Sequence, residues 1–192
     1  GALQLVIGGA EAGAALTGDA RVMGVAFTGS TGTARAIARS LLDDETRPLV
    51  PLIAETGGLN AMIVDSTALP EQVVVDVVTS AFRSAGQRCS ALRLLLLQED
   101  IADKTLEMLS GAMDTLTVGA PGDPRTDVGP VIDTAAYDKL EAYRQSMKSR
   151  WIHTIAVPAD GNFVAPTAIR PDKIADMTPA WAADITGVPA AR

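Results

Sequence analysis

The chain has 192 residues, of which 47% are hydrophobic and 20% charged, and its formal net charge is -7. This composition indicates a globular protein with one core, or two small domains sharing an interface, and not a disordered chain. The negative charge and the scattered basic residues exclude a nucleic-acid-binding surface in this segment, because phosphate contacts need clustered Lys and Arg. No apolar run approaches the roughly 20 residues of a membrane-spanning helix, so we expect no transmembrane segment and no signal peptide.

The chain contains one cysteine, Cys89, and one histidine, His153. A single cysteine excludes an internal disulfide and fits a reducing compartment, so we expect a cytoplasmic protein. A single histidine excludes a Cys/His zinc site, and we expect no metal and interpret His153 as an ordinary strand residue. Any chemistry must therefore come from Cys89, carboxylates, hydroxyls and backbone amides.

The first part of the chain alternates between short apolar runs and helical periodicity. We predict strands at residues 3–7, 22–27 and 48–54, with a helix after each of the first two. In the second of these helices, residues 34–42, the apolar side chains recur at helical spacing, while Arg35 and Arg39 face away. Apolar strands that alternate with helices indicate a parallel α/β sheet covered on both faces.

The second part continues the alternation. A strand is predicted at residues 61–64, and Asp65, Ser66 and Thr67 are expected to cap the following helix. That helix carries a wide apolar stripe over residues 73–85 and ends at Gly86. A buried strand at 92–97, an amphipathic helix at 101–116, a Gly/Pro loop at 119–130 and a helix at 136–147 complete the prediction.

Neither glycine-rich turn of this chain fits a standard nucleotide-binding fingerprint. Ala10 and Thr31 occupy the place of the second glycine of G-x-G-x-x-G, and the Gly-Lys-Ser/Thr of a P-loop is absent from the second turn. Residues 27–31 nevertheless join an apolar strand to a helix, and the amides and hydroxyls of such a helix start suit an anionic phosphate. An ordinary strand–helix turn explains this segment equally well.

Cys89 and Glu55 are the candidate chemical groups. Cys89 follows a long apolar helix within a polar turn, where its sulfur would be accessible and Arg88 or nearby amides would favour the thiolate. The alternative is an inert buried cysteine. Glu55 directly follows an apolar strand and precedes two glycines. Such a carboxylate is either a solvated strand end or a general base in a partly dry cleft.

Taken together, three short motifs stand in the order and spacing of the aldehyde dehydrogenase superfamily, whose signatures have the form F-T-G-S, E-x-G-G and G-Q-x-C. They are Phe27-Thr28-Gly29-Ser30, Glu55-Thr56-Gly57-Gly58 and Gly86-Gln87-Arg88-Cys89. The resemblance runs from residue 1 to about residue 177. Residues 51–65, 80–93 and 127–133 most resemble the L-glutamate γ-semialdehyde dehydrogenase module of the bifunctional proline-utilisation proteins.

The resemblance implies the fold of that family, α/β with parallel sheets, in two incomplete domains. Residues 1–56 would be a remnant of the NAD-binding domain, and residues 57–192 part of the cysteine-bearing catalytic domain. The implied reaction is the NAD-dependent oxidation of L-glutamate γ-semialdehyde to glutamate in proline catabolism. Cys89 would form the thiohemiacetal and then the thioester, and Glu55 would activate the water that hydrolyses the thioester.

Binding roles carry over in the same way. Gly29 and Ser30 would contact the pyrophosphate of the cofactor, and Gly57 falls where the family's backbone passes the nicotinamide. The backbone amide of Cys89 would supply half of an oxyanion hole, and Ser90 is a candidate contact of the substrate carboxylate. The resemblance also implies a homo-oligomer, or a part of a larger chain. We expect Cys89, Glu55 and the Gly29-Ser30 turn to converge on one cleft.

Several parts of the family pattern do not occur in this chain. The upstream asparagine of the oxyanion hole and the lysine that holds the adenosine ribose are not found. Residues after about 177 depart from the expected E-x-F-G-P segment, and residues 151–158 fit the family poorly. We therefore expect little or no turnover by these residues alone. A catalytically silent fragment and a dehydrogenase for another small aldehyde remain alternatives, and the choice between NAD and NADP stays open.

Overall fold

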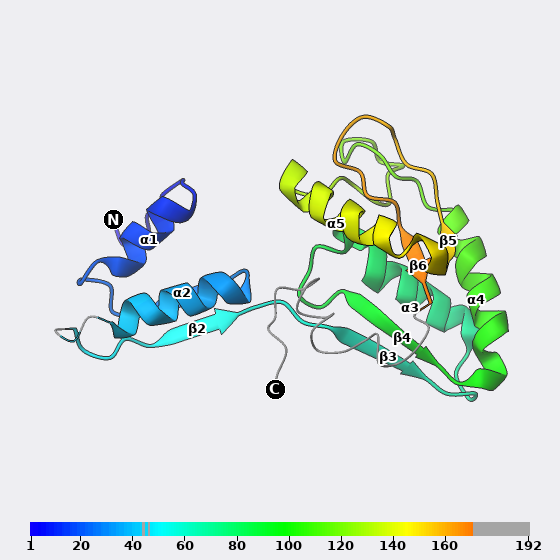
Figure 1. Ribbon diagram of the computed structural model, residues 1–192, viewed down its shortest axis with the longest axis horizontal. Helices are drawn as coiled ribbons and strands as arrows, with labels where there is room; N and C mark the ends of the chain where they lie inside the picture. Colours follow the sequence, from blue (N-terminus) through cyan, green and yellow to red (C-terminus); the bar gives the residue numbers. More distant parts are fainter. Residues whose placement is uncertain (44, 46, 171–192) are drawn as a thin grey trace.

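A computed structural model of the chain describes residues 1–43, 45 and 47–170. The N-terminal group of elements consists of α1 (Ala10–Gly18), β1 (Val25–Thr28), α2 (Thr31–Leu42) and β2 (Leu52–Glu55). The second group consists of β3 (Asn60–Val64), α3 (Pro70–Phe82), the 3-10 helix η1 (Arg83–Gly86), β4 (Leu92–Leu97), α4 (Glu99–Asp114), α5 (Thr134–Ser146), the 3-10 helix η2 (Lys148–Arg150), β5 (Trp151–Thr154) and β6 (Thr167–Ile169). Figure 1 shows the two groups on either side of the extended connection from β2 to β3.

The N-terminal group is built on one pair of parallel strands. β1 and β2 pair from Val25↔Leu52 to Thr28↔Glu55, and α2 packs its buried residues Ala34 and Leu41 inward. Both predicted strands are longer than the observed ones, because backbone pairing begins only at Val25 and Leu52. Parallel pairing within an α/β arrangement confirms the predicted fold class for this part of the chain.

The predicted strand at residues 3–7 is wrong. These residues form no helix or strand, and the side chains of Leu3 and Ile7 are 94% and 90% exposed. A strand needs a neighbour for its backbone hydrogen bonds, and within the described residues no strand lies beside this segment. The apolar composition is therefore present without the pairing that would make it a strand.

The second group holds most of the buried side chains. β3 and β4 pair in parallel, and α3 packs against both α4 and β4. Their shared core consists of residues from all four elements, namely Val64, Val73, Val74, Val77, Leu92, Leu109 and Met113. The apolar stripe predicted over residues 73–85 thus faces the core as expected, although α3 ends at Phe82 and η1 continues to Gly86.

The predicted helix cap at residues 65–67 is also wrong. The helix starts at Pro70 with Leu69 at its N-cap position, and no side chain caps it. Asp65 instead accepts hydrogen bonds from the backbone N–H of Thr67 at 2.8 Å and from its hydroxyl at 2.6 Å. These bonds close a local turn and lower the pKa of Asp65. Pro70 can begin the helix because the first helical N–H needs no partner within the helix.

The remaining elements cover the core. β5 and β6 form an antiparallel pair, and α4 contacts β5. His153 lies in β5 as expected, with its Nε2 2.7 Å from Asp114 Oδ1 at the end of α4. None of the described helices is long and apolar enough to span a membrane. The departure from the family pattern expected after residue 177 lies outside the described residues, and the domain division at residue 56 stays a prediction.

Candidate active site

Cys89 lies in a turn that a left-handed stretch of backbone introduces. Ser84, Ala85 and Gly86 have φ angles of 57°, 52° and 66° between α3 and the turn. Left-handed backbone costs about 1–2 kcal/mol for a residue with a side chain, so this stretch must be stabilised by its surroundings. Gly86 is required there, since a Cβ would lie 2.8 Å from the carbonyl oxygen of Ala81.

Three side chains hold this turn. The guanidinium of Arg93, from β4, donates to the carbonyl of Gly86. The side-chain amide of Gln87 donates to Ser84 O at 3.1 Å and accepts from the backbone N–H of Ile132 at 2.8 Å. The amide nitrogen of Asn60 donates to the carbonyls of Cys89 at 2.6 Å and Ala91 at 2.9 Å. Cys89 itself is exposed, so the buried-cysteine alternative does not describe it.

Glu55 ends β2, and the backbone N–H of Gly29 donates to its carbonyl at 3.0 Å. This bond places the turn after β1 beside the end of β2, as parallel pairing requires. The Glu55 side chain is exposed, so the described residues do not provide the partly dry cleft that the base role predicts. At position 29 a Cβ would meet the ring of Phe27 at 2.5 Å, so a larger residue there would require this ring to move.

Ser30 caps α2, because its hydroxyl accepts from the backbone N–H of Thr33 at 3.1 Å. The backbone amides of Thr31 and Gly32 donate to no other residue within the described part of the chain. Thr31 Oγ1 is buried there without a hydrogen-bond partner. The two unpaired amides at the start of α2 have the polarity that suits an anion, whereas the buried Thr31 hydroxyl oxygen is not accessible to one.

One cavity of about 980 Å³ joins most of the predicted site. Its lining includes Gly29, Glu55, Gly57 and Cys89, whereas Ser30 and Ser90 are not part of it. Cys89, Glu55 and Gly29 thus share the lining of one cavity, whereas Ser30 lies outside it, and the roles assigned to these residues stay predictions. Within residues 1–43, 45 and 47–170 no cluster of His, Cys, Asp or Glu could hold a metal ion.

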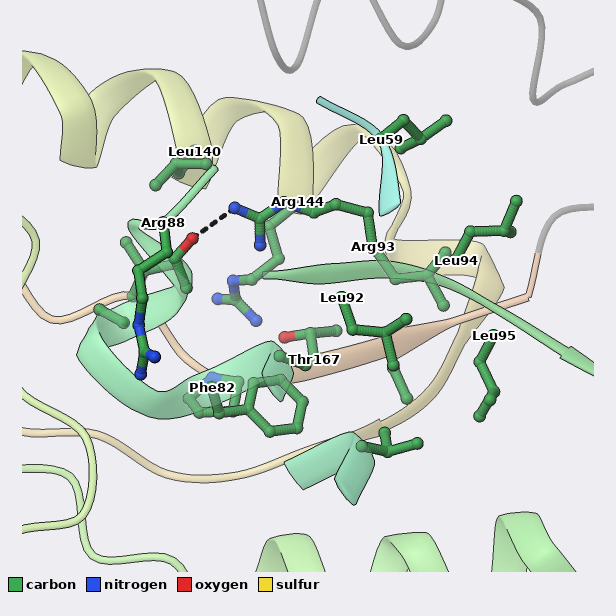
Figure 2. A pocket seen from close by; sticks show the side chains of 18 of the residues that line it. Leu59, Phe82, Arg88, Leu92, Arg93, Leu94, Leu95, Leu140, Arg144 and Thr167 are labelled. Carbon is green, nitrogen blue, oxygen red and sulfur yellow. Dashed lines mark hydrogen bonds between the residues drawn. The ribbon is translucent and has the colours of Figure 1, made fainter. Parts of the chain in front are cut away.

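Apolar side chains and the arginines Arg88, Arg93, Arg144 and Arg170 line the cavity. Figure 2 shows Phe82, Leu92 and Leu95 around it, with the side chains of Arg93 and Arg144 extending into the same region. Arg144 hydrogen-bonds both carboxylate oxygens of Glu141, at 2.7 and 2.8 Å, and lies over the Trp151 ring at 4.4 Å. Its charge is therefore largely committed to α5 and β5.

Sequence reasoning missed Asn60 and Arg93. Both lie on strands, and the contacts that tie them to the Cys89 turn depend on which strands become neighbours. A weak signal was available for Asn60, because asparagine is disfavoured in strands and stands here at the start of an otherwise apolar one. The cysteine turn is thus held by residues that precede it by 29 positions or follow it by only a few.

Comparisons with known proteins find relatives that match most of the chain. The bifunctional protein PutA of Escherichia coli (strain K12) is 52% identical over 191 residues, which cover 92% of this chain and 14% of that protein. Hydroxyisobutyraldehyde dehydrogenase of Mycolicibacterium austroafricanum is 41% identical over 175 residues, 87% of this chain and 34% of that one. The chain therefore spans only 14% of the length of this PutA relative.

Solved structures give the same result for the fold. A variant of proline utilization A from Bradyrhizobium japonicum superposes with a TM-score of 0.85 at 54% identity, covering 89% of this chain and 18% of that one. The 1-pyrroline-5-carboxylate dehydrogenase from Thermus with bound NAD superposes with a TM-score of 0.74 at 30% identity, covering 82% and 31%. A sequence model of the aldehyde dehydrogenase family matches residues 1–178. The chain belongs to the aldehyde dehydrogenase family.

Proposed function

We propose that this chain supplies the nucleophile and the base for the NAD-dependent oxidation of L-glutamate γ-semialdehyde to glutamate, a step of proline catabolism. The observation that carries the proposal is that Cys89 and Glu55, from separate segments, line one cavity. The names and identities of the PutA relatives support the choice of substrate. In the full-length protein, the chain would act as part of a larger polypeptide or of a homo-oligomer.

In the proposed reaction the Cys89 thiolate adds to the aldehyde carbon and forms a thiohemiacetal. A nicotinamide cofactor, held beside Gly57, would supply the acceptor for the hydride of that carbon, and Cys89 would then carry an acyl thioester. Glu55 then removes a proton from a water molecule, whose oxygen attacks the thioester and releases the carboxylic acid and the thiol. The base does not need to touch the sulfur, because a water molecule must fit between the carboxylate and the thioester.

The oxygen of the thiohemiacetal carries negative charge as it forms, and it needs a hydrogen-bond donor. We assign this role to the backbone amide of Cys89. Among the described residues, that amide donates no hydrogen bond, so it is available to the oxyanion. Ser90, exposed in the same turn, is the proposed contact of the substrate carboxylate.

For the cofactor we propose that Gly29 and Ser30 lie beside the pyrophosphate and Gly57 beside the nicotinamide. The unpaired amides at the start of α2 support a phosphate there. Ser30 would act mainly by shaping the helix start, since its hydroxyl already caps α2. We propose NAD as the cofactor, in line with the NAD-bound relative from Thermus.

Cys89 is the only cysteine of the chain, so its alkylation by iodoacetamide reports on this residue alone. Glutamate semialdehyde should slow the alkylation, because the thiohemiacetal masks the sulfur. Succinic semialdehyde, which lacks the amino group and the same carboxylate spacing, should protect at higher concentration only. Equal protection by unrelated small aldehydes would favour a dehydrogenase of other specificity, to which the 41% identical hydroxyisobutyraldehyde dehydrogenase points.

The role of Glu55 can be tested without cofactor. Nitrophenyl acetate should acylate Cys89, and Glu55→Gln should slow the deacylation by about 10²-fold or more while leaving the acylation rate unchanged. Glu71→Gln, in the first turn of α3, is a matched control outside the cavity and should behave like the parent chain. Deacylation that is unaffected by Glu55→Gln would remove Glu55 from the mechanism. A chain that neither binds aldehyde nor turns over the ester would be the catalytically silent alternative.

A further inference from the structure

Asn60 bridges the two segments that carry the proposed nucleophile and base. It is the first residue of β3 and follows Glu55 by five positions in the chain. Its side-chain nitrogen lies 2.6 Å from Cys89 O and 2.9 Å from Ala91 O. An asparagine amide has two N–H donors, and both are used here. The opposite orientation of the amide would place its oxygen against two carbonyl oxygens, so the chemistry fixes which way the group points.

The bridge lies at the first pair of the β3–β4 ladder, next to an irregularity. The register between β3 and β4 shifts at this point, since Asn60 lies opposite Leu92 and Ala61 opposite Leu94. Irregularities of this kind leave backbone groups without their ladder partners and are frequent beside active sites. Cys89 and Ala91 precede the first residue of β4, and the Asn60 side chain provides hydrogen-bond donors for their carbonyls just before the ladder begins.

We infer that Asn60 is a positioning residue for the Cys89 nucleophile, an inference that rests on the proposed role of Cys89. The amide hydrogens turn the carbonyl dipoles of Cys89 and Ala91 toward β3 and compensate their negative ends. With both carbonyl oxygens paired, their negative ends act less on the turn that carries the Cys89 sulfur. Asn60 also fixes the cysteine turn to the segment that continues from Glu55, which relates the two proposed chemical groups through one short stretch of backbone.

The direction in which the alkylation rate of Cys89 changes on mutation of Asn60 distinguishes a positioning role from a general structural role. Loss of a merely structural contact would loosen the turn and leave the exposed thiol as reactive as before, or more so. Loss of a positioning contact should make the thiol less reactive at neutral pH, because less of it is ionised. At alkaline pH, where all of the thiol is ionised, the difference should disappear.

The experiment measures iodoacetamide alkylation of Cys89 across pH in four folded proteins, the parent chain and its Asn60→Ala, Asn60→Asp and Ser80→Ala variants. Ser80 is the matched control, because its hydroxyl accepts a hydrogen bond from the backbone N–H of Leu92 at 3.1 Å, directly after Ala91, and donates none to the Cys89 carbonyl. The quantity compared is the alkylation rate at neutral pH divided by the rate at alkaline pH. This ratio should be lower in Asn60→Ala than in the parent chain by on the order of 3- to 10-fold, which corresponds to the free energy of one net hydrogen bond. It should fall further in Asn60→Asp, which adds a negative charge, and stay unchanged in Ser80→Ala.

An Asn60→Ala protein that is folded by circular dichroism and alkylates at the parent rate or faster at neutral pH would overturn the inference. Should Asn60→Ala fail to fold, Asn60→Asp keeps the test, because it preserves the shape of the side chain while it replaces the two N–H donors by a charged acceptor. Aldehyde protection of the parent chain is measured in parallel. If no aldehyde protects Cys89, the proposed function fails, while the order of the four alkylation profiles still decides whether Asn60 positions the thiol.

Discussion

Replacing Gly86 by alanine should destabilise the protein, while the same change at Gly111 should stabilise it. Gly86 has a φ of +66°, and an added Cβ would lie 2.8 Å from Ala81 O, a backbone atom at the end of α3. Gly111 lies within α4, and a Cβ there meets nothing within 4 Å. The two substitutions are chemically identical, so any difference between them comes from the local backbone.

The magnitudes follow from the geometry. Left-handed backbone costs alanine about 1–2 kcal/mol, and the contact with Ala81 O adds to this cost. Alanine also lowers the conformational entropy of the unfolded chain, which offsets about 0.4–1 kcal/mol of this loss. We therefore expect Gly86→Ala to lose about 1–3 kcal/mol. In the exposed middle of a helix alanine exceeds glycine by about 0.5–1 kcal/mol, which is the expected gain for Gly111→Ala.

Urea unfolding followed by circular dichroism measures both effects, and an unchanged slope against denaturant shows that the unfolded state is comparable. The midpoint of Gly86→Ala should shift downward and that of Gly111→Ala upward. Gly86→Ala should also change the alkylation rate of Cys89, because the turn that carries the thiol must move. Midpoints that shift in the same direction for both variants would refute the reasoning from the left-handed turn.

Three further outcomes are expected. Thr105 is fully buried and its hydroxyl has no partner within the described residues, so Thr105→Val should raise the unfolding free energy by about 1 kcal/mol, and a clear loss in urea would contradict this. The hydrogen bonds of Arg144 lower the pKa of Glu141 in the folded protein. The ionised Glu141 therefore stabilises the fold fully above its unfolded pKa of about 4.3, and this stabilisation is lost as the pH falls through the folded pKa. Glu141→Gln should therefore lower the Tm at neutral pH, with a difference from the parent that shrinks in acid; a difference independent of pH would exclude the ion pair. The 192-residue chain alone should form little or no NADH from glutamate semialdehyde, since a missing oxyanion donor typically costs about 10²–10³ in rate, and robust turnover by monodisperse protein would refute this.

The periodicity of apolar residues was sufficient to predict the buried strand and the helices that carry one continuous apolar stripe. β4 covers residues 92–97 as expected, and the helices over residues 101–116 and 136–147 appear with slightly earlier boundaries, as α4 and α5. The helices form their backbone hydrogen bonds within the helix and pack through one apolar face, and β4 is apolar apart from Arg93. Their pattern therefore carries enough information to locate them.

Predictions failed where the structure depends on a partner that local sequence does not specify. Residues 3–7 have strand composition but no neighbouring strand among the described residues. The Asp65 carboxylate accepts a hydrogen bond from the backbone N–H of Thr67 within a local turn, and it does not cap the helix that follows. The proposed nucleophile and base were found through three motifs in register, whereas Asn60 required knowing that β3 and β4 are adjacent.

The unequal distribution of buried side chains has a consequence for motion. Of the buried hydrophobic residues described, only Ala34 and Leu41 precede residue 60. Regions with few buried contacts open locally at low free energy, so amide hydrogens of β1 and β2 should exchange much faster than those of β3 and β4. The proposed base Glu55 lies in the part with few buried side chains and the proposed nucleophile Cys89 in the well-packed part, so local opening would separate the two groups. Contacts that cover the outer face of β2 would raise the effective concentration of the carboxylate, and with it the rate of deacylation, without changing a single reacting group.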